Sequence, residues 1–128
     1  MAAPGVVILD TNVLIEIIRK NISVISKCDE IGTNHLAISS ISRCEFLLGS
    51  RNREEFEKNK RFVDKFQLLR GNEEIDEILT KLYDNYSLNY RPAIPDMIIA
   101  ATALYHEFEL YTLNKKDFRF IPGIKLIE

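Results

Sequence analysis

Four acidic residues occupy positions where a carboxylate could take part in chemistry. They are Asp10, which interrupts the apolar run VVILDTNVLIEII, Glu45 in SISRCEF, Asp96 after Pro95, and Asp117 in TLNKKDF. Charged side chains are rarely buried without a partner, and neighbouring carboxylates repel one another unless a cation neutralises them. Oxygen ligands suit Mg²⁺ or Mn²⁺, whereas zinc prefers histidine or cysteine. If the four acids converge, we expect a metal site that supports phosphodiester hydrolysis.

Each of these acids also has a purely structural interpretation. Asp10 could cap the helix that follows it, and Ser42 with Glu45 matches a capping box. Asp96 could complement the dipole at a helix start, and Asp117 could cap a turn or simply be solvated. The coincidence of four such acids favours one shared functional site over four separate structural roles.

Polar and basic residues surround the last acid. Thr112 and Asn114 could orient a carboxylate or a water molecule, although asparagine after a strand commonly serves local turn chemistry. Lys115, Lys116 and Arg119 flank Asp117 and could hold a phosphate backbone. A solvated turn is an equally favoured interpretation of these three cations.

The elements that must position these residues alternate between strands and helices. Short apolar runs predict strands at 6–9, 36–39, 66–69 and 110–113, with 124–127 as a candidate fifth. Apolar residues at helical spacing, or mostly charged blocks, predict helices at 13–18, 41–48, 51–65, 75–86 and 96–109. This alternation predicts a three-layer α/β/α domain with a central parallel sheet of four to five strands. In such sheets the functional crevice lies beyond the carboxyl ends of the strands, where the four acids fall.

The composition fits a single globular domain spanning residues 1–128. The chain is 46% hydrophobic and 28% charged, and its formal net charge is -2. A field of that sign would not attract nucleic acid unaided, so such binding would need a local basic rim or bound cations. Cys28 and Cys44 lack the spacing of a disulfide framework, and we find no signal peptide or membrane-spanning run. We therefore expect a cytoplasmic protein that makes no membrane contact.

The acids lie within motifs that resemble those of the PIN-domain nucleases, in particular the VapC-like toxins of toxin/antitoxin modules. The resemblance covers nearly the whole chain, through ILDTNVLIEII, LAISSISRCEFLLG, IPDMIIAATAL and LYTLNKKDF followed by IPGIKLIE. The four acids follow one another at separations of 35, 51 and 21 residues. One such motif would be weakly specific, but four motifs in this order are strongly specific.

The resemblance implies both a chemistry and a set of partners. It implies a metal-dependent endoribonuclease in which Asp10, Glu45, Asp96 and Asp117 hold Mg²⁺ or Mn²⁺, with support from residues matching Thr11, Asn12, Thr112 and Asn114. It also implies an RNA substrate, a cognate antitoxin and a homodimer, for which Tyr83 and Tyr86 on the long helix are candidate interface residues. Arg91 and Pro92 depart from the family, which often carries glycine in this segment. This departure bears on how the substrate fits and not on the chemistry.

Other classes of protein fit the sequence less well. A phosphatase of the haloacid dehalogenase type needs a second aspartate two residues after the first, where this chain has Asn12. A receiver-like module needs an aspartate after the third strand, where 66–69 is followed by Arg70 and Gly71. A PIN-type nuclease that processes RNA without an antitoxin, and a non-enzymatic metal-binding α/β module, are the alternatives that we retain.

Overall fold

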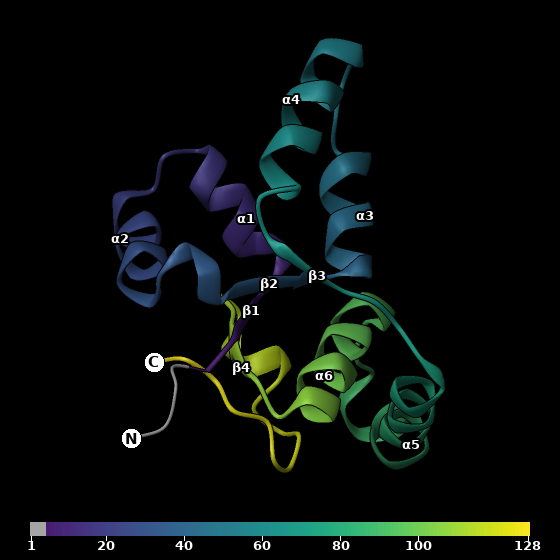
Figure 1. The fold of residues 1–128 in the computed structure, drawn as a ribbon. Coiled ribbons are helices and arrows are strands. Elements are labelled where there is room, and N and C mark those ends of the chain that lie inside the picture. The colour runs from purple at the N-terminus through teal and green to yellow at the C-terminus, as the bar shows by residue number, and fades with distance from the viewer. Residues whose placement is uncertain (1–4) are drawn as a thin grey trace.

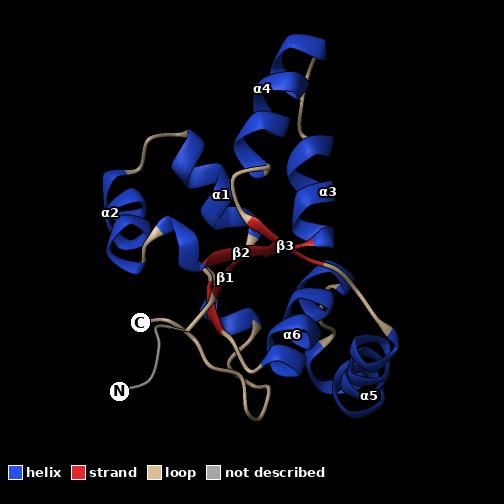
Figure 2. Cartoon of the chain, in the orientation of Figure 1, coloured by secondary structure: helices blue, strands red, loops and turns tan. Residues whose placement is uncertain are grey.

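The computed structural model describes residues 5–128 (Figure 1). The strands are β1 (Val7–Leu9), β2 (Leu36–Ser39), β3 (Gln67–Leu69) and β4 (Glu109–Tyr111). The helices are α1 (Thr11–Ile18), α2 (Ile22–Ile31), α3 (Ser40–Leu48), α4 (Arg53–Val63), α5 (Glu73–Tyr90) and α6 (Ile94–His106), with short 3-10 turns at Thr33–His35 and Lys115–Asp117. Within residues 5–128 the strands form one four-stranded sheet in the order β3-β2-β1-β4, and every strand pair is parallel (Figure 2).

Helices cover both faces of this sheet, which confirms the predicted three-layer α/β/α architecture. Side chains alternate across a strand, so Ile8 of β1 faces one layer whereas Val7 and Leu9 face the other. Ile8 belongs to a buried cluster with residues of α5 and α6, and Leu9 belongs to a cluster with residues of α1, α2, α3 and α4. Figure 1 shows α5 and α6 on one side of the strands and α1, α2, α3 and α4 on the opposite side.

The central position of β1 explains its sequence. Its three residues are all buried, and it pairs with β2 on one side and with β4 on the other. A strand covered on both faces and both edges reads as an unbroken apolar run instead of an alternating one. The residue that follows this strand is therefore held firmly at the carboxyl edge of the sheet.

Several predicted elements differ from the structure. Helix α2 was not predicted, because only Val24 and Cys28 of its ten residues are buried and its apolar stripe is correspondingly short. Helix α6 ends at His106, three residues before the predicted end, since Glu107 adopts a left-handed conformation with φ of 57°. Among the described residues the segment 124–127 forms no strand, and its sheet contact is a bridge between Leu110 and Leu126.

No helix within residues 5–128 combines the length and the apolar character that crossing a lipid bilayer requires.

Candidate active site

Asp10 lies at the buried centre of the carboxyl edge of the sheet. It follows β1 directly, is only 5% exposed, and its backbone N–H donates to the carbonyl of Tyr111 at 2.9 Å. Its carboxylate accepts hydrogen bonds from the backbone N–H of Thr11 at 2.7 Å and from Thr112 Oγ1 at 2.8 Å. Asp10 is thus the N-cap of α1, as its structural interpretation predicted, and it also faces the other acids.

Glu45 is held next to Asp10 by a side-chain hydrogen bond. Thr11 Oγ1 donates to Glu45 Oε1 at 2.7 Å, which ties α3 to the start of α1. The structural alternative for Glu45, a capping box with Ser42, does not apply, because Ser39 is the N-cap of α3 and accepts from the backbone N–H of Ser42 at 3.2 Å. Glu45 therefore lies within the helix, where its carboxylate is free to face the site.

Asp96 and Asp117 approach from the other layer of helices. Asp96 lies in the first turn of α6, which Pro95 also occupies, and Asp117 ends the 3-10 turn Lys115–Asp117 after β4. Burial raises the pKa of Asp96 to about 6, and the negative charges of Asp10, Asp117 and Glu45 add to the rise. The structure therefore brings all four predicted acids into one electrostatic neighbourhood.

The same repulsion acts on Asp10, whose pKa is raised chiefly by burial. Its hydrogen bonds from Thr112 and Thr11 oppose that rise, whereas the charges of Glu45 and Asp117 add to it. Within residues 5–128, the ion pairs join other residues and none involves the four acids. The site therefore has an excess of negative charge with no cationic side chain bound to it.

These acids fit a divalent metal by their chemistry. Every side chain that could coordinate is a carboxylate, the ligand that Mg²⁺ and Mn²⁺ prefer. Across the described part of the chain, however, no three His, Cys, Asp or Glu side chains lie close enough together to hold an ion between them. The four carboxylates therefore repel one another as they stand, and their side chains would have to move closer together for three or more of them to bind one ion.

The predicted polar residues support the edge of the site in ways that the sequence did not fully reveal. Asn12 Oδ1 accepts from the backbone N–H of Leu113 at 3.3 Å, which joins α1 to the end of β4. Thr112 is 1% exposed, and its Oγ1 accepts from the backbone N–H of Asn114 at 3.0 Å while it donates to Asp10. Asn114 thus contributes a backbone donor here. Within residues 5–128 its side chain makes no hydrogen bond that would support the predicted role of orienting a carboxylate.

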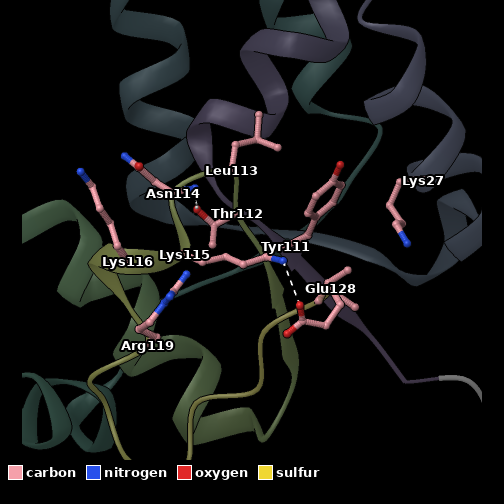
Figure 3. A pocket seen from close by; sticks show the side chains of 10 residues that line it. Lys27, Tyr111, Thr112, Leu113, Asn114, Lys115, Lys116, Arg119 and Glu128 are labelled. Atoms are coloured by element: carbon pink, nitrogen blue, oxygen red, sulfur yellow. Dashed lines mark hydrogen bonds and ion pairs between the residues drawn. The ribbon is translucent and has the colours of Figure 1, made fainter.

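A basic cavity of about 490 Å³ lies beside these supporting residues (Figure 3). Its cations are Lys27, Lys115, Lys116 and Arg119. Lys115 forms an ion pair with Glu128 at 3.2 Å, drawn as a dashed line in Figure 3. Sequence reasoning missed Lys27, which is on α2 and 88 residues before Lys115, because no local pattern links it to the motif around Asp117.

A second cavity has a volume of about 250 Å³. Its lining includes Asp96, Asp117, Lys116 and the aromatic residues Tyr90 and Phe120. Lys116 lines both cavities, so they lie next to each other along the edge of the acid cluster.

The chain is similar to several known proteins in sequence and in fold. Ribonuclease VapC1 of Rickettsia felis is 30% identical over an alignment that covers 94% of this chain and 93% of that protein. A toxin–antitoxin complex from Klebsiella pneumoniae contains a chain that is 28% identical, with a TM-score of 0.80 and coverage of 95% of this chain and 96% of that one. The DNA-bound VapBC complex from Salmonella typhimurium, at 23% identity, shares the fold with a TM-score of 0.83 and coverage of 96% and 97%.

The family model of the PIN domain matches residues 7–123, a span that begins at β1 and includes all four acids. The parallel sheet, the acid placed after its central strand and this nearly full-length match lead to the same assignment: the chain belongs to the PIN-domain family and is similar to the VapC ribonucleases.

Proposed function

We propose that the chain is a metal-dependent endoribonuclease and the toxin of a toxin/antitoxin pair. The observation that carries the proposal is the buried Asp10, held by Thr112 and surrounded by three further carboxylates that no cationic side chain neutralises among the described ion pairs. The similarity to proteins named as VapC ribonucleases supports the substrate, RNA.

Asp10, Glu45, Asp96 and Asp117 would hold Mg²⁺ or Mn²⁺ at the edge of the sheet. When bound, such an ion lowers the pKa of water and stabilises the charge that develops on a phosphate during in-line displacement. The chain itself fixes the ligands: Thr112 and Thr11 hold the Asp10 carboxylate, and Thr11 also holds Glu45 through its hydroxyl group. Burial and the neighbouring acids raise the pKa of Asp96 to about 6, and its carboxyl group must lose its proton before it can coordinate a metal.

The basic cavity of Figure 3 supplies a path for the phosphate backbone of the RNA. Lys116 and Arg119 lie close in sequence to Asp117, and Lys27 adds a charge from α2. Cations so close to the acids would position an RNA strand across them and offset the net charge of -2 locally. Lys115 and Lys116, predicted from the sequence as substrate contacts, both line this cavity.

A separate groove of about 710 Å³ suits an antitoxin segment. Residues of α1, α3 and α4 line it, including the exposed Ile15 and Ile18 as well as Glu45 of the active site. Figure 1 shows α3 and α4 side by side, extending away from the sheet. A partner segment could bury its apolar side chains on Ile15 and Ile18 and place an arginine near Glu45, because a guanidinium pairs with carboxylates in two-pronged geometry.

The antitoxin proposal has a direct test in the purified complex. Inhibition of RNA cleavage should weaken when the inserted arginine becomes alanine, and it should weaken again as Mn²⁺ is raised, since both cations compete for the same carboxylates. Inhibition that responds to neither change would mean that the partner blocks RNA elsewhere.

We also propose that two copies of this chain form a homodimer. Tyr83 and Tyr86, expected at its interface, instead pack against the core of their own chain, and the Tyr83 hydroxyl donates to the carbonyl of Pro92 at 2.8 Å. The exposed apolar side chains of this region include Leu88, 87% exposed, and Ile94, 56% exposed, and these could provide the interface instead. Light scattering at micromolar concentration should report twice the mass of 14.8 kDa, and a monomer would count against the proposal.

The nuclease proposal is tested by RNA cleavage with and without Mg²⁺ or Mn²⁺. The wild-type chain should cleave only with the metal, and Asp10→Asn and Asp96→Asn should each remove most of the activity while the fold persists. Asp84→Asn is a matched control, because Asp84 is an exposed acid in the middle of α5. Cleavage at the wild-type rate by both well-folded active-site variants would overturn the assignment.

A further inference from the structure

The small cavity beside Asp96 and Asp117 has an aromatic wall. Tyr90 and Phe120 stack in parallel within it, with ring centroids 4.1 Å apart and an interplanar angle of 8°. Tyr86 contacts both rings edge-on, at 6.0 Å from Tyr90 and 5.3 Å from Phe120. Phe120 in turn packs against the main core, so the Tyr90 ring is held in place from behind.

The Tyr90 ring nevertheless has surface to offer. Phe120 stacks on one of its faces, yet Tyr90 is 53% exposed, so part of the side chain remains accessible to a ligand. An aromatic ring that is fixed on one side and open on the other is a platform for stacking. Because the ring is already held in place, the protein loses little conformational entropy when a planar ligand binds. Every nucleobase has a flat face that can occupy such a platform.

Charged groups of both signs stand around the same cavity. Arg91 and Lys116 contribute cations to its lining, and Asp96 and Asp117 contribute two of the four active-site acids. Arg91 follows α5 directly and has a left-handed backbone conformation, with φ of 43°. Residues other than glycine seldom adopt this conformation. Arg91 thus adds a charged side chain to the cavity wall.

We infer that this cavity is a nucleobase subsite: the base of a nucleotide next to the scissile phosphate stacks on Tyr90, and Arg91 and Lys116 hold its phosphate. The inference rests on the proposed nuclease function and adds a position of contact within the RNA. Lys116 also lines the basic cavity of Figure 3, so the strand would run from the Tyr90 platform past the acids and into that cavity. Stacking on one base and charge contacts to the backbone would together fix the register of the RNA.

The test combines a change in the protein with the removal of one base from the RNA. The cleavage site of the wild-type chain is mapped first, and RNA oligonucleotides are then made with a single abasic position at each nucleotide around it. Tyr90→Leu should raise KM for intact RNA about tenfold with little change in kcat, because stacking holds substrate and transition state alike. Tyr90→Phe keeps the ring and should retain the wild-type KM.

The abasic series makes the effect specific to one position. At one nucleotide beside the cleavage site, loss of the base should raise the wild-type KM about as much as Tyr90→Leu does, and Tyr90→Leu should then add nothing further. Tyr105→Leu is the matched control, since Tyr105 is 41% exposed on α6 and outside the cavity. A wild-type KM for Tyr90→Leu, or equal losses on intact and abasic RNA at every position, would overturn the inference.

Two further measurements separate the competing explanations. Light scattering of Tyr90→Leu should show the wild-type mass, and a changed mass would assign Tyr90 to a subunit interface and overturn the subsite. If the wild-type chain cleaves no RNA, the nuclease proposal fails. Fluorescence anisotropy with one short RNA oligonucleotide, intact and with an abasic position at each nucleotide in turn, then tests the subsite alone. Tighter binding of intact than of abasic RNA, lost in Tyr90→Leu, would support the subsite, and equal binding would overturn it.

Discussion

Replacing Asp96 with asparagine should make the metal-free protein more stable even though it removes activity. The pKa of Asp96 rises from 3.8 to about 6, mainly through burial and then through the charges of Asp10, Asp117 and Glu45. At 1.36 kcal/mol per unit, that rise corresponds to about 3 kcal/mol of unfavourable free energy for the ionised group in the folded state. Asparagine is similar in size but carries no charge, so it avoids this penalty.

The net effect is smaller than this upper limit for two reasons. Asp96 is only partly buried, so solvent screening reduces the penalty to about 2 kcal/mol. An acid in the first turn of a helix also gains about 0.3–1 kcal/mol from the helix dipole, which asparagine gives up. We therefore expect Asp96→Asn to raise the free energy of unfolding in EDTA by about 1 kcal/mol at pH 7.5, or the Tm by about 4 °C.

The pH dependence follows from the sign of the shift. Because the folded state holds the Asp96 proton more tightly than the unfolded state, the wild-type chain keeps this part of its stability below pH 3.8 and loses it as the pH rises through about 6. The difference between Asp96→Asn and the wild type should thus be small near pH 4 and full above pH 6.

Urea denaturation in EDTA across this pH range measures the difference, with Asp84→Asn as the control for loss of an exposed charge. Saturating Mg²⁺ should then stabilise the wild type more than the variant, because only the wild type keeps all four carboxylates. A variant that is less stable than the wild type at pH 7.5, or one whose difference is the same at pH 4, would refute the reasoning.

Three further substitutions test other parts of the structure. Thr112→Val removes the buried hydroxyl that donates to Asp10; it should lower the free energy of unfolding by about 1–2 kcal/mol and reduce cleavage, and unchanged urea denaturation would contradict the contact. Ile18→Asp places a charge in the groove between α1, α3 and α4, so the concentration of antitoxin needed for half-inhibition should rise at least tenfold, and an unchanged titration would exclude this groove. Phe118→Ala removes a fully buried ring; it should destabilise the fold by about 3–5 kcal/mol in thermal or urea denaturation, whereas a loss below 1 kcal/mol would show that the core collapses around the site.

Most of the fold could be predicted from local patterns. The run at 6–9 is apolar because β1 is covered on both faces, and the helical spacing around Val13 and Leu14 marks the face of α1 that packs on the sheet. Proline before Asp96 marked the start of α6. These signals lie within a few residues of one another, and burial of a single face is enough to create them.

The missed elements are those whose pattern depends on distant partners. Helix α2 buries only Val24 and Cys28, which leaves little periodicity to detect. The capping-box interpretation of Ser42 and Glu45 does not apply, because Ser39, the last residue of β2, is the N-cap of α3. The segment at 124–127 has the composition of a strand, but its contact with the sheet is a single bridge at Leu110. The N–H of Leu110 donates to the carbonyl of Lys125, and the carbonyl of Leu110 accepts from the N–H of Ile127.

By itself, the sequence determined which residues could do the chemistry. Asp10 after a buried strand, and three more acids after or at the start of later elements, predict a shared site because the carboxyl ends of parallel strands meet at one edge of a sheet. Only the tertiary structure decided how these acids are held and what lies beside them. Thr112 donates to Asp10, Lys27 lines one cavity with Lys115, and Tyr90 stacks on Phe120. The residues of each pair are at least 30 positions apart in the sequence, so only the packing of the whole chain brings them together.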